Sequence, residues 1–292
     1  MNYHHLARLL VGLGICATLG ACQNTTAISS AQRGTCDRPA ALLIGYWPPT
    51  NEMLRAWSKN PAQNTDGWQG EDWRGLGYDV YAYLPEFPPD GDPTNDDFGS
   101  DGWVGSPDSD FRVDFQDTSA DFWRVAEAHQ PRIIITTSRG NGADWELEAI
   151  EGGHGKPASA EESVNPAADW RSDEHGRHGW PSENTIDARS WAGISRYRAG
   201  NRLPSTLPLA EIEAATRALD IGAVEIDRTG TSGNYLSGFL GLHGLLYDES
   251  SETTIAAGHI HVRKGLAVAT ARAFMETTLE TVLQHHRSPC AL

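Results

Sequence analysis

Hydrophobic and polar positions along this chain fall into blocks with two periods, one typical of β-strands and the other of α-helices. Short apolar or alternating runs bounded by Gly and Pro predict strands. Longer runs with apolar residues along one helical face predict helices between those strands. The expected strands lie at 40–47, 77–88, 131–140, 221–227 and 253–262, and the expected helices lie at 121–130, 208–220, 236–247 and 266–286.

The alternation of strands and helices favours an α/β fold, and we expect a single domain over residues 38–289. Its architecture should have three layers, with a central, mostly parallel mixed sheet and helices on both faces. Two polar stretches interrupt the pattern. Residues 89–110 are rich in Asp, Gly and Pro and predict a surface loop, whereas residues 151–200 predict an insertion or a cover over an active site.

The first residues, 1–21, predict a signal peptide. In MNYHHLARLLVGLGICATLGAC, Arg8 precedes an apolar run that is too short to span a bilayer, and small residues follow. The run ends in Leu-Gly-Ala-Cys, which resembles a bacterial lipobox, so we expect cleavage before Cys22 and a lipid on its thiol. Residues 22–37 would tether the domain to the bacterial cell envelope, with the periplasmic side of the outer membrane as the expected location. The alternative is an ordinary secreted protein.

Net charge and cysteine content limit the classes of binding partner and the cellular compartments that fit this chain. A net charge of −16 opposes binding to nucleic acid and to anionic membrane surfaces, so we expect membrane contact through the N-terminal lipid only. Cys16 leaves with the leader and Cys22 takes the lipid, which leaves Cys36 and Cys290. In an oxidising compartment we expect these two to form a disulfide, because chain ends often lie close together; two free thiols are the alternative.

Three expected strand ends carry residues suited to chemistry, and in an open α/β sheet such ends gather at one edge. One leads to Glu146 and Glu148, one leads to Ser237 at the start of a helix, and one carries His261. A nucleophile, a base and an orienting carboxylate are the groups that acyl transfer needs. Spacing alone leaves the alternative that these are solvated polar residues.

The other histidines have structural interpretations. We expect His259 on the opposite face of its strand from His261, in packing or at the surface, and His243 as a hydrogen-bonded histidine within its helix. His175 and His178 form a His-x-x-His pair, but no carboxylate or cysteine accompanies them at a spacing typical of zinc sites. We therefore expect no bound metal and no cofactor.

Several segments resemble pyroglutamyl peptidase I in the order of that family, over roughly residues 40–285. ALLIGYWPP followed by Asn60 and a proline is similar to the opening strand and loop of the family, and YLPEF resembles its Leu-Pro-Val segment. WELE resembles the segment that ends in the catalytic glutamate, SGNYLSG resembles the catalytic turn, and AGHIHV resembles the segment of the catalytic histidine. The resemblance implies the family's fold, with Ser237 at the nucleophile position, His261 as the base and Glu148 as the carboxylate that orients it.

Substrate contacts are also expected from this resemblance. It implies ligand contacts from Tyr46 and Asn60, and we add Trp47, which could stack on a substrate ring, and Arg139. The expected substrate is a small peptide or an acyl amide.

The chain departs from the family most at the nucleophile, where Ser237 replaces a cysteine; Pro49 and Gly238 also replace an aromatic residue and an asparagine. A serine must lose its proton to a positioned base during attack, whereas a cysteine can be partly thiolate near neutral pH. Two functions therefore stay open. One is an exported hydrolase that cleaves an amide bond at a blocked N-terminal residue or a related small acyl group. The other is an inactive envelope binding protein that keeps the fold and pocket, and the oligomeric state stays open in both.

Overall fold

A computed structural model describes residues 36–87, 110–113, 115–151, 203–230 and 236–291. The elements belong to the unit that begins at Asp37. In chain order they are β1 (Ala40–Gly45), η1 (Glu52–Trp57), η2 (Trp73–Gly75), β2 (Asp79–Tyr83), α1 (Phe115–His129), β3 (Ile133–Gly140), β4 (Trp145–Glu148), β5 (Ile150–Glu151), β6 (Leu203–Pro204), α2 (Leu209–Arg217), β7 (Val224–Asp227), α3 (Leu236–Ser250), β8 (Ala256–Arg263) and α4 (Val268–His285).

Six of the described strands form one sheet in the order β2-β1-β3-β8-β4-β7. Every neighbouring pair in it is parallel except β4 and β8, which are antiparallel. β1, β3 and β8 are buried along almost their whole lengths, as continuous apolar strands are when both faces of a sheet are covered. The sheet is therefore mostly parallel and mixed, which confirms the expected architecture.

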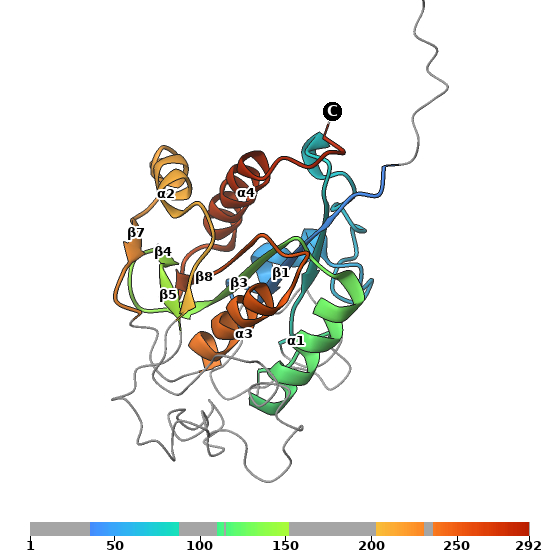
Figure 1. The fold of residues 1–292 in the computed structure, drawn as a ribbon. Helices are drawn as coiled ribbons and strands as arrows, with labels where there is room; N and C mark the ends of the chain where they lie inside the picture. The colour runs from blue at the N-terminus through green and yellow to red at the C-terminus, as the bar shows by residue number, and fades with distance from the viewer. Residues whose placement is uncertain (1–35, 88–109, 114, 152–202, 231–235, 292) are drawn as a thin grey trace, which may run out of the picture. The chain divides into compact units, whose positions relative to one another are not determined.

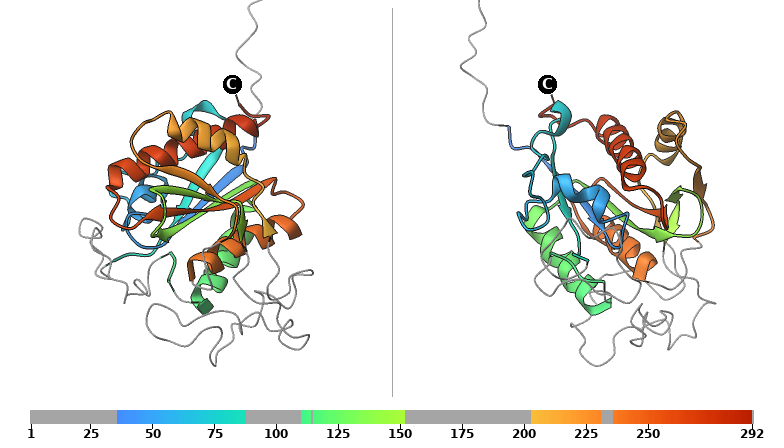
Figure 2. Two further views of the ribbon diagram at one scale, coloured as in Figure 1. Left: turned by 90° about the vertical axis from the view of Figure 1, so that its left-hand side faces the viewer. Right: turned by 180° about the vertical axis from the view of Figure 1, so that it is seen from behind.

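Helices cover both faces of this sheet (Figure 1, Figure 2). One apolar core lies under α2, α4 and η1, and a second lies under α1 and α3. Leu43 of β1 packs in the first core, while its neighbours Leu42 and Ile44 pack in the second, because side chains alternate along a strand. The sheet thus separates two apolar layers.

The carboxyl ends of β1, β3 and β8 lie together, and we call this the site edge. Gly45, Gly140 and Arg263 are the last residues of these three strands. In the parallel registers Gly45 is paired with Thr137, and Gly140 with Arg263. Residues that follow the strands here are therefore the ones that the fold brings together.

The predicted elements are confirmed in type, with differences at their boundaries. The helix expected from residue 121 already begins at Phe115, since the polar residues of its first turns continue the helix. Trp145–Glu148 forms the strand β4, which we did not predict. The expected insertion begins and ends at a two-stranded ribbon, β5 with β6. Residues 88–109 and 152–202, which hold most of the predicted loop and insertion, lie outside the described residues.

The predictions for the amino-terminal region have only partial counterparts in the structure. The expected signal peptide at 1–21 and the lipid-bearing Cys22 lie outside the described residues. Among those that are described, no helix combines the length and the apolar character needed to cross a membrane. Cys36 and Cys290 are both disulfide-bonded, so the structure contains the candidate pair for the expected bridge.

Candidate active site

β8 delivers two histidines to the site edge, and both lie on the same face of the strand. The His259 and His261 ring centroids are 4.8 Å apart, with the rings edge to face. The expectation that they point to opposite faces is wrong, since residues two apart in a strand share a face. Both are buried: His259 is inaccessible to solvent and His261 is 4% exposed. The packing of α3 against this face explains the burial.

A glutamate from β4 holds the second of these histidines. The Nδ1 of His261 lies 2.6 Å from Glu148 Oε1, and Glu148 is 1% exposed. Because β4 runs antiparallel to β8, Glu146 is directly opposite His261 in the register and Glu148 is its diagonal neighbour on the same face. Burial raises the pKa of Glu148, and the hydrogen bond to His261 opposes that shift. Its other oxygen, Oε2, is buried and has no hydrogen-bond partner among the described residues.

Two hydroxyl groups from β3 hold the first histidine. Thr136 Oγ1 lies 2.8 Å from His259 Nδ1, and Ser138 Oγ lies 2.8 Å from His259 Nε2. Burial, together with the neighbouring charge of His261, lowers the pKa of His259 well below its ordinary value, so this imidazole is neutral at pH 7. A neutral imidazole donates through one nitrogen and accepts through the other, and both hydroxyls can complement it. This network fixes the ring against which His261 packs.

Close contacts show how α3 runs over these strands. A Cβ added to Gly241 would lie 2.8 Å from His259 Cβ, so the helix backbone lies directly on this histidine. A Cβ added to Gly244 would lie 3.3 Å from Ile134 Cγ2 and 3.6 Å from Thr136 Cγ2. In the register Thr136 is paired with His259, and Ile134 is paired with Ala257, which lies nearer the start of β8. From Gly241 to Gly244 the helix therefore moves towards the start of β8, so α3 runs antiparallel to β8.

The direction of α3 determines how far along β8, towards the site edge, Ser237 lies. This residue lies one turn before Gly241, about 6 Å closer to the site edge. His261 lies two residues beyond His259, about 7 Å in the same direction. Ser237, 9% exposed in the first turn of α3, is therefore at the level of His261. Within the described part of the chain its hydroxyl forms no hydrogen bond to His261, whose Nδ1 is bonded to Glu148.

The resulting arrangement suits nucleophilic catalysis. Glu148 occupies Nδ1 of His261 and so leaves Nε2 as the nitrogen that can take a proton from a hydroxyl. Ser237 lies at the amino end of α3, where the helix dipole and unpaired main-chain N–H groups favour negative charge. Glu146 is half-buried beside these groups, and burial, followed by the charge of Glu148, raises its pKa to about 6.

The predicted substrate contacts lie in two places. Tyr46 has no exposed surface, packs edge-on against Trp47 and hydrogen-bonds through its hydroxyl to Thr118. Trp47 follows β1 at the site edge, and the Arg139 guanidinium lies 5.0 Å from its ring centroid. Asn60 instead donates a 3.4 Å hydrogen bond to Asp110 and lines a pocket beside β2. The structure thus brings Trp47 and Arg139 together and places Asn60 elsewhere.

Two groups of side chains have the composition of a metal site. Glu151, His259 and His261 form one group, and Glu146, Glu148 and His261 form the other, each with ligand atoms within 4.8 Å of one another. Both nitrogens of His259 already have hydroxyl partners, and Nδ1 of His261 has Glu148. A metal held by the first group would therefore have to displace a hydroxyl from His259, whereas in the second group Glu148 Oε2 has no hydrogen-bond partner among the described residues. The His175 and His178 pair lies outside the described residues.

Sequence reasoning missed the hydroxyl partners of His259. Thr136 and Ser138 lie in IIITTSRG, a run that predicts a buried strand and gives no sign of its polar partners. The strand β4 could have been found, because Trp-Glu-Leu-Glu alternates apolar and polar residues with the period of a strand. His243 is as expected: its Nδ1 lies 2.8 Å from the main-chain oxygen of Phe239, and its Nε2 lies 3.1 Å from Ser119 Oγ.

Comparison with known proteins identifies the fold. No protein-family model matches this chain, and no curated protein sequence matches it. Solved structures of pyrrolidone carboxyl peptidases do match. The enzyme of Pyrococcus furiosus, solved with its Cys-free mutant, aligns with a TM-score of 0.53 at 15% identity, over 84% of this chain and 99% of that chain. The enzyme of Thermococcus litoralis aligns with a TM-score of 0.53 at 14% identity, over 85% of this chain and 94% of that chain. The chain has the pyrrolidone carboxyl peptidase-like fold that the sequence resemblance implied.

Proposed function

We propose that this protein is a peptidase-like hydrolase that cleaves an amide bond at a blocked N-terminal residue or a related small acyl group. The observation that carries the proposal is the buried pair of His261 Nδ1 and Glu148 Oε1, 2.6 Å apart at the site edge. An imidazole with one nitrogen bound to a buried carboxylate is oriented to act as a base through the other. Similarity of fold to pyrrolidone carboxyl peptidases supports the reaction class.

Ser237 is the proposed nucleophile. Its Oγ attacks the amide carbonyl carbon while His261 Nε2 takes the hydroxyl proton, and main-chain N–H groups at the start of α3 stabilise the oxyanion. The carbon–nitrogen bond then breaks, and the amine leaves with the proton held by His261. Water attacks the acyl-serine, again giving its proton to His261, and the serine hydroxyl is restored as the acid leaves. Glu148 stays ionised and stabilises the imidazolium in both steps.

Substrate binding is assigned to the same edge of the sheet. Trp47 and Arg139 pack against each other where β1 and β3 end, and we propose that they border the site of the acyl group. Tyr46 is fully buried behind Trp47 and supports its position through packing. A planar ring in the substrate fits an aromatic wall, and its amide groups can bond to the guanidinium.

Hydrolysis of a fluorogenic pyroglutamyl amide tests the proposal. The purified protein carrying Cys22→Ser should release the fluorophore, and the additional change Ser237→Ala should abolish the release. A fluorophosphonate probe should label the first protein and not the second. Activity that survives Ser237→Ala would overturn the assignment of the nucleophile.

A binding protein without turnover is the second candidate. It is favoured by the absence, within the described residues, of a hydrogen bond between Ser237 and His261. In that case pyroglutamyl ligands raise the melting temperature while no amide is cleaved, and Ser237→Cys is inactive as well.

Export and lipid anchoring belong to the same proposal. The apolar leader that ends at Cys22 supports them, as do the two disulfide-bonded cysteines, since disulfides persist in oxidising compartments. Replacement of Cys22 by serine should release the protein from the membrane fraction. A variant that stays membrane-bound would contradict lipid attachment at this residue.

A further inference from the structure

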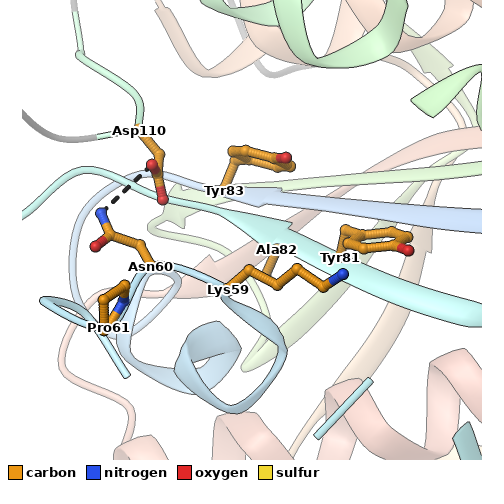
Figure 3. Close-up of a pocket in the computed structure, with 7 residues that line it drawn as sticks. All are labelled: Lys59, Asn60, Pro61, Tyr81, Ala82, Tyr83 and Asp110. Carbon is orange, nitrogen blue, oxygen red and sulfur yellow. Dashed lines mark hydrogen bonds between the residues drawn. The ribbon is translucent and has the colours of Figure 1, made fainter. Parts of the chain in front are cut away.

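A pocket separate from the His261 site lies beside the edge strand β2. It has a volume of about 370 Å³, and its walls are the loop 59–61, residues 81–83 of β2 and Asp110 (Figure 3). β1 and β3 separate β2 from β8 in the sheet, so the pocket does not share its walls with His261. Its volume is within the range of small-molecule sites.

One end of the pocket carries a carboxyl group with little compensation. Asp110 accepts a 3.4 Å hydrogen bond from the Asn60 amide, and burial raises its pKa to about 6. The guanidinium of Arg124 donates to the main-chain oxygen of Asp110 and is paired with the carboxylate of Asp121. Among the described residues the Asp110 carboxylate forms no salt bridge, and the charge of Arg124 only partly opposes the rise in its pKa. A ligand that brings an ammonium group would offset the cost of burying this charge.

The other end of the pocket carries the positively charged side chain of Lys59. The Lys59 ammonium lies 3.9 Å from the Trp68 ring centroid and 4.9 Å from the Tyr81 ring centroid. In the part of the chain that the structure describes, it forms no salt bridge. Figure 3 shows Lys59 extending along β2 towards Tyr81, away from Asn60 and Asp110. The pocket therefore has opposite charges at its two ends.

The aromatic wall between these charges is already held in place. Tyr81 stacks on His129 with a centroid separation of 4.1 Å and on Trp68 with one of 5.2 Å. The Tyr83 hydroxyl lies 2.6 Å from His129 Nε2. Burial, and then the charge of Asp110, raise the pKa of Tyr83, so the carboxylate lies at the Tyr83 end. A pre-formed wall lowers the entropy cost of binding.

The length of the pocket wall along β2 indicates the size of the ligand. Tyr81 and Tyr83 are two residues apart on one face of β2, which corresponds to about 7 Å. An extended peptide spans about 3.5 Å per residue, so two residues carry an α-ammonium and an α-carboxylate about that far apart. We propose that this pocket binds a short zwitterionic peptide of about two residues, with its ammonium at Asp110 and its carboxylate at Lys59. The proposal goes beyond the hydrolase function and does not depend on it.

Calorimetric titration of the full chain with alanyl-alanine tests the proposal. The free dipeptide should bind at least about tenfold more tightly than N-acetyl-alanyl-alanine or alanyl-alanine amide, since each blocked form loses one charge-assisted hydrogen bond. Equal affinity for the free and blocked forms, or no binding of the free dipeptide at millimolar concentration, would overturn it.

Substitutions place the binding in this pocket rather than at the His261 site. Asp110→Asn should weaken alanyl-alanine binding about tenfold and leave binding of the N-acetyl form unchanged. Lys59→Met should weaken alanyl-alanine in the same way and leave the amide unchanged. Asp220→Asn, at an exposed position in another part of the chain, is the matched control and should change neither. If Asp110→Asn and its control bind alanyl-alanine equally while both remain folded, the assignment to this pocket is wrong.

Discussion

The close approach of α3 to β8 predicts opposite effects for one substitution at two positions of one helix. Glycine within a helix costs about 1 kcal/mol relative to alanine, so Gly→Ala usually stabilises. At Gly241, however, the new Cβ would lie 2.8 Å from His259 Cβ and Cγ and 3.1 Å from Glu151 Cγ. At Gly244 the nearest atom would be Ile134 Cγ2 at 3.3 Å, which needs only a small adjustment.

The magnitude follows from the displacement that each alanine requires. Ordinary contact begins near 3.4 Å, so Gly241→Ala must separate helix and strand by about 0.6 Å, the difference between 3.4 and 2.8 Å. Overpacking of this kind costs about 1–3 kcal/mol, and the helix gain offsets about 1 of it. The net cost is then about 0–2 kcal/mol, so we expect Gly241→Ala to lower the melting temperature by up to about 8 °C, and Gly244→Ala to leave it unchanged or raise it slightly.

Thermal unfolding of the two variants beside the unmodified protein checks this reasoning. In the hydrolysis assay Gly241→Ala should also lower kcat/KM by about tenfold, because moving α3 moves Ser237 relative to His261. Gly244→Ala is the control for helix propensity in the same element. Equal melting temperatures for both variants would refute the close approach of α3 to His259.

Three further substitutions test the buried polar groups. Glu148→Gln should lower kcat/KM by about a hundredfold or more in the hydrolysis assay, since a neutral amide cannot stabilise an imidazolium; unchanged activity would remove Glu148 from the mechanism. Burial lowers the pKa of His243 to about 4, so the unfolded chain binds a proton there below about pH 6.5 that the folded chain does not, and this contribution to stability is lost as the pH falls towards 4. Urea unfolding should therefore show a smaller loss of stability between pH 7 and pH 5 in His243→Gln, and an identical loss would contradict a buried neutral imidazole. His259→Phe leaves the hydroxyls of Thr136 and Ser138 without their partner and should cost about 2–4 kcal/mol in the same unfolding assay. Adding Thr136→Val and Ser138→Ala should recover most of that loss, and a triple variant as unstable as the single one would show that the hydroxyls are not responsible.

Much of the fold could be predicted from hydrophobic patterning, because the secondary structure of long apolar or periodic segments is determined mainly by their own sequence. The strands 40–45, 133–140 and 256–263 and the helix 268–285 were expected close to these bounds. The four-residue strand β4 has the alternation of a strand, but a segment this short is stable as a strand only when its neighbours are in place. Its antiparallel pairing with β8 depends on contacts that no local pattern encodes.

The candidate site could also be predicted only in part. Ser237, His261 and Glu148 were selected by family resemblance, and the structure brings His261 and Glu148 into hydrogen-bond contact. Their catalytic roles stay predictions, as does ligand contact by Asn60. The network of His259 could not be predicted, because its partners come from β3 through the register of the sheet. The position of His259 beside His261 could be predicted, however, because residues two apart in a strand share a face.

The direction of the parallel strands has a consequence for where the two ends of the domain lie relative to the His261 site. The chain enters β1 at Ala40, at the end of the strand opposite the site edge. The carboxyl-terminal residues are at the same end, because Cys290 Sγ lies 3.4 Å from the main-chain oxygen of Asp37. The entry of the chain into the domain and its carboxyl-terminal residues therefore both lie at the pole opposite the His261 site, so an attachment through either of them is made away from that site.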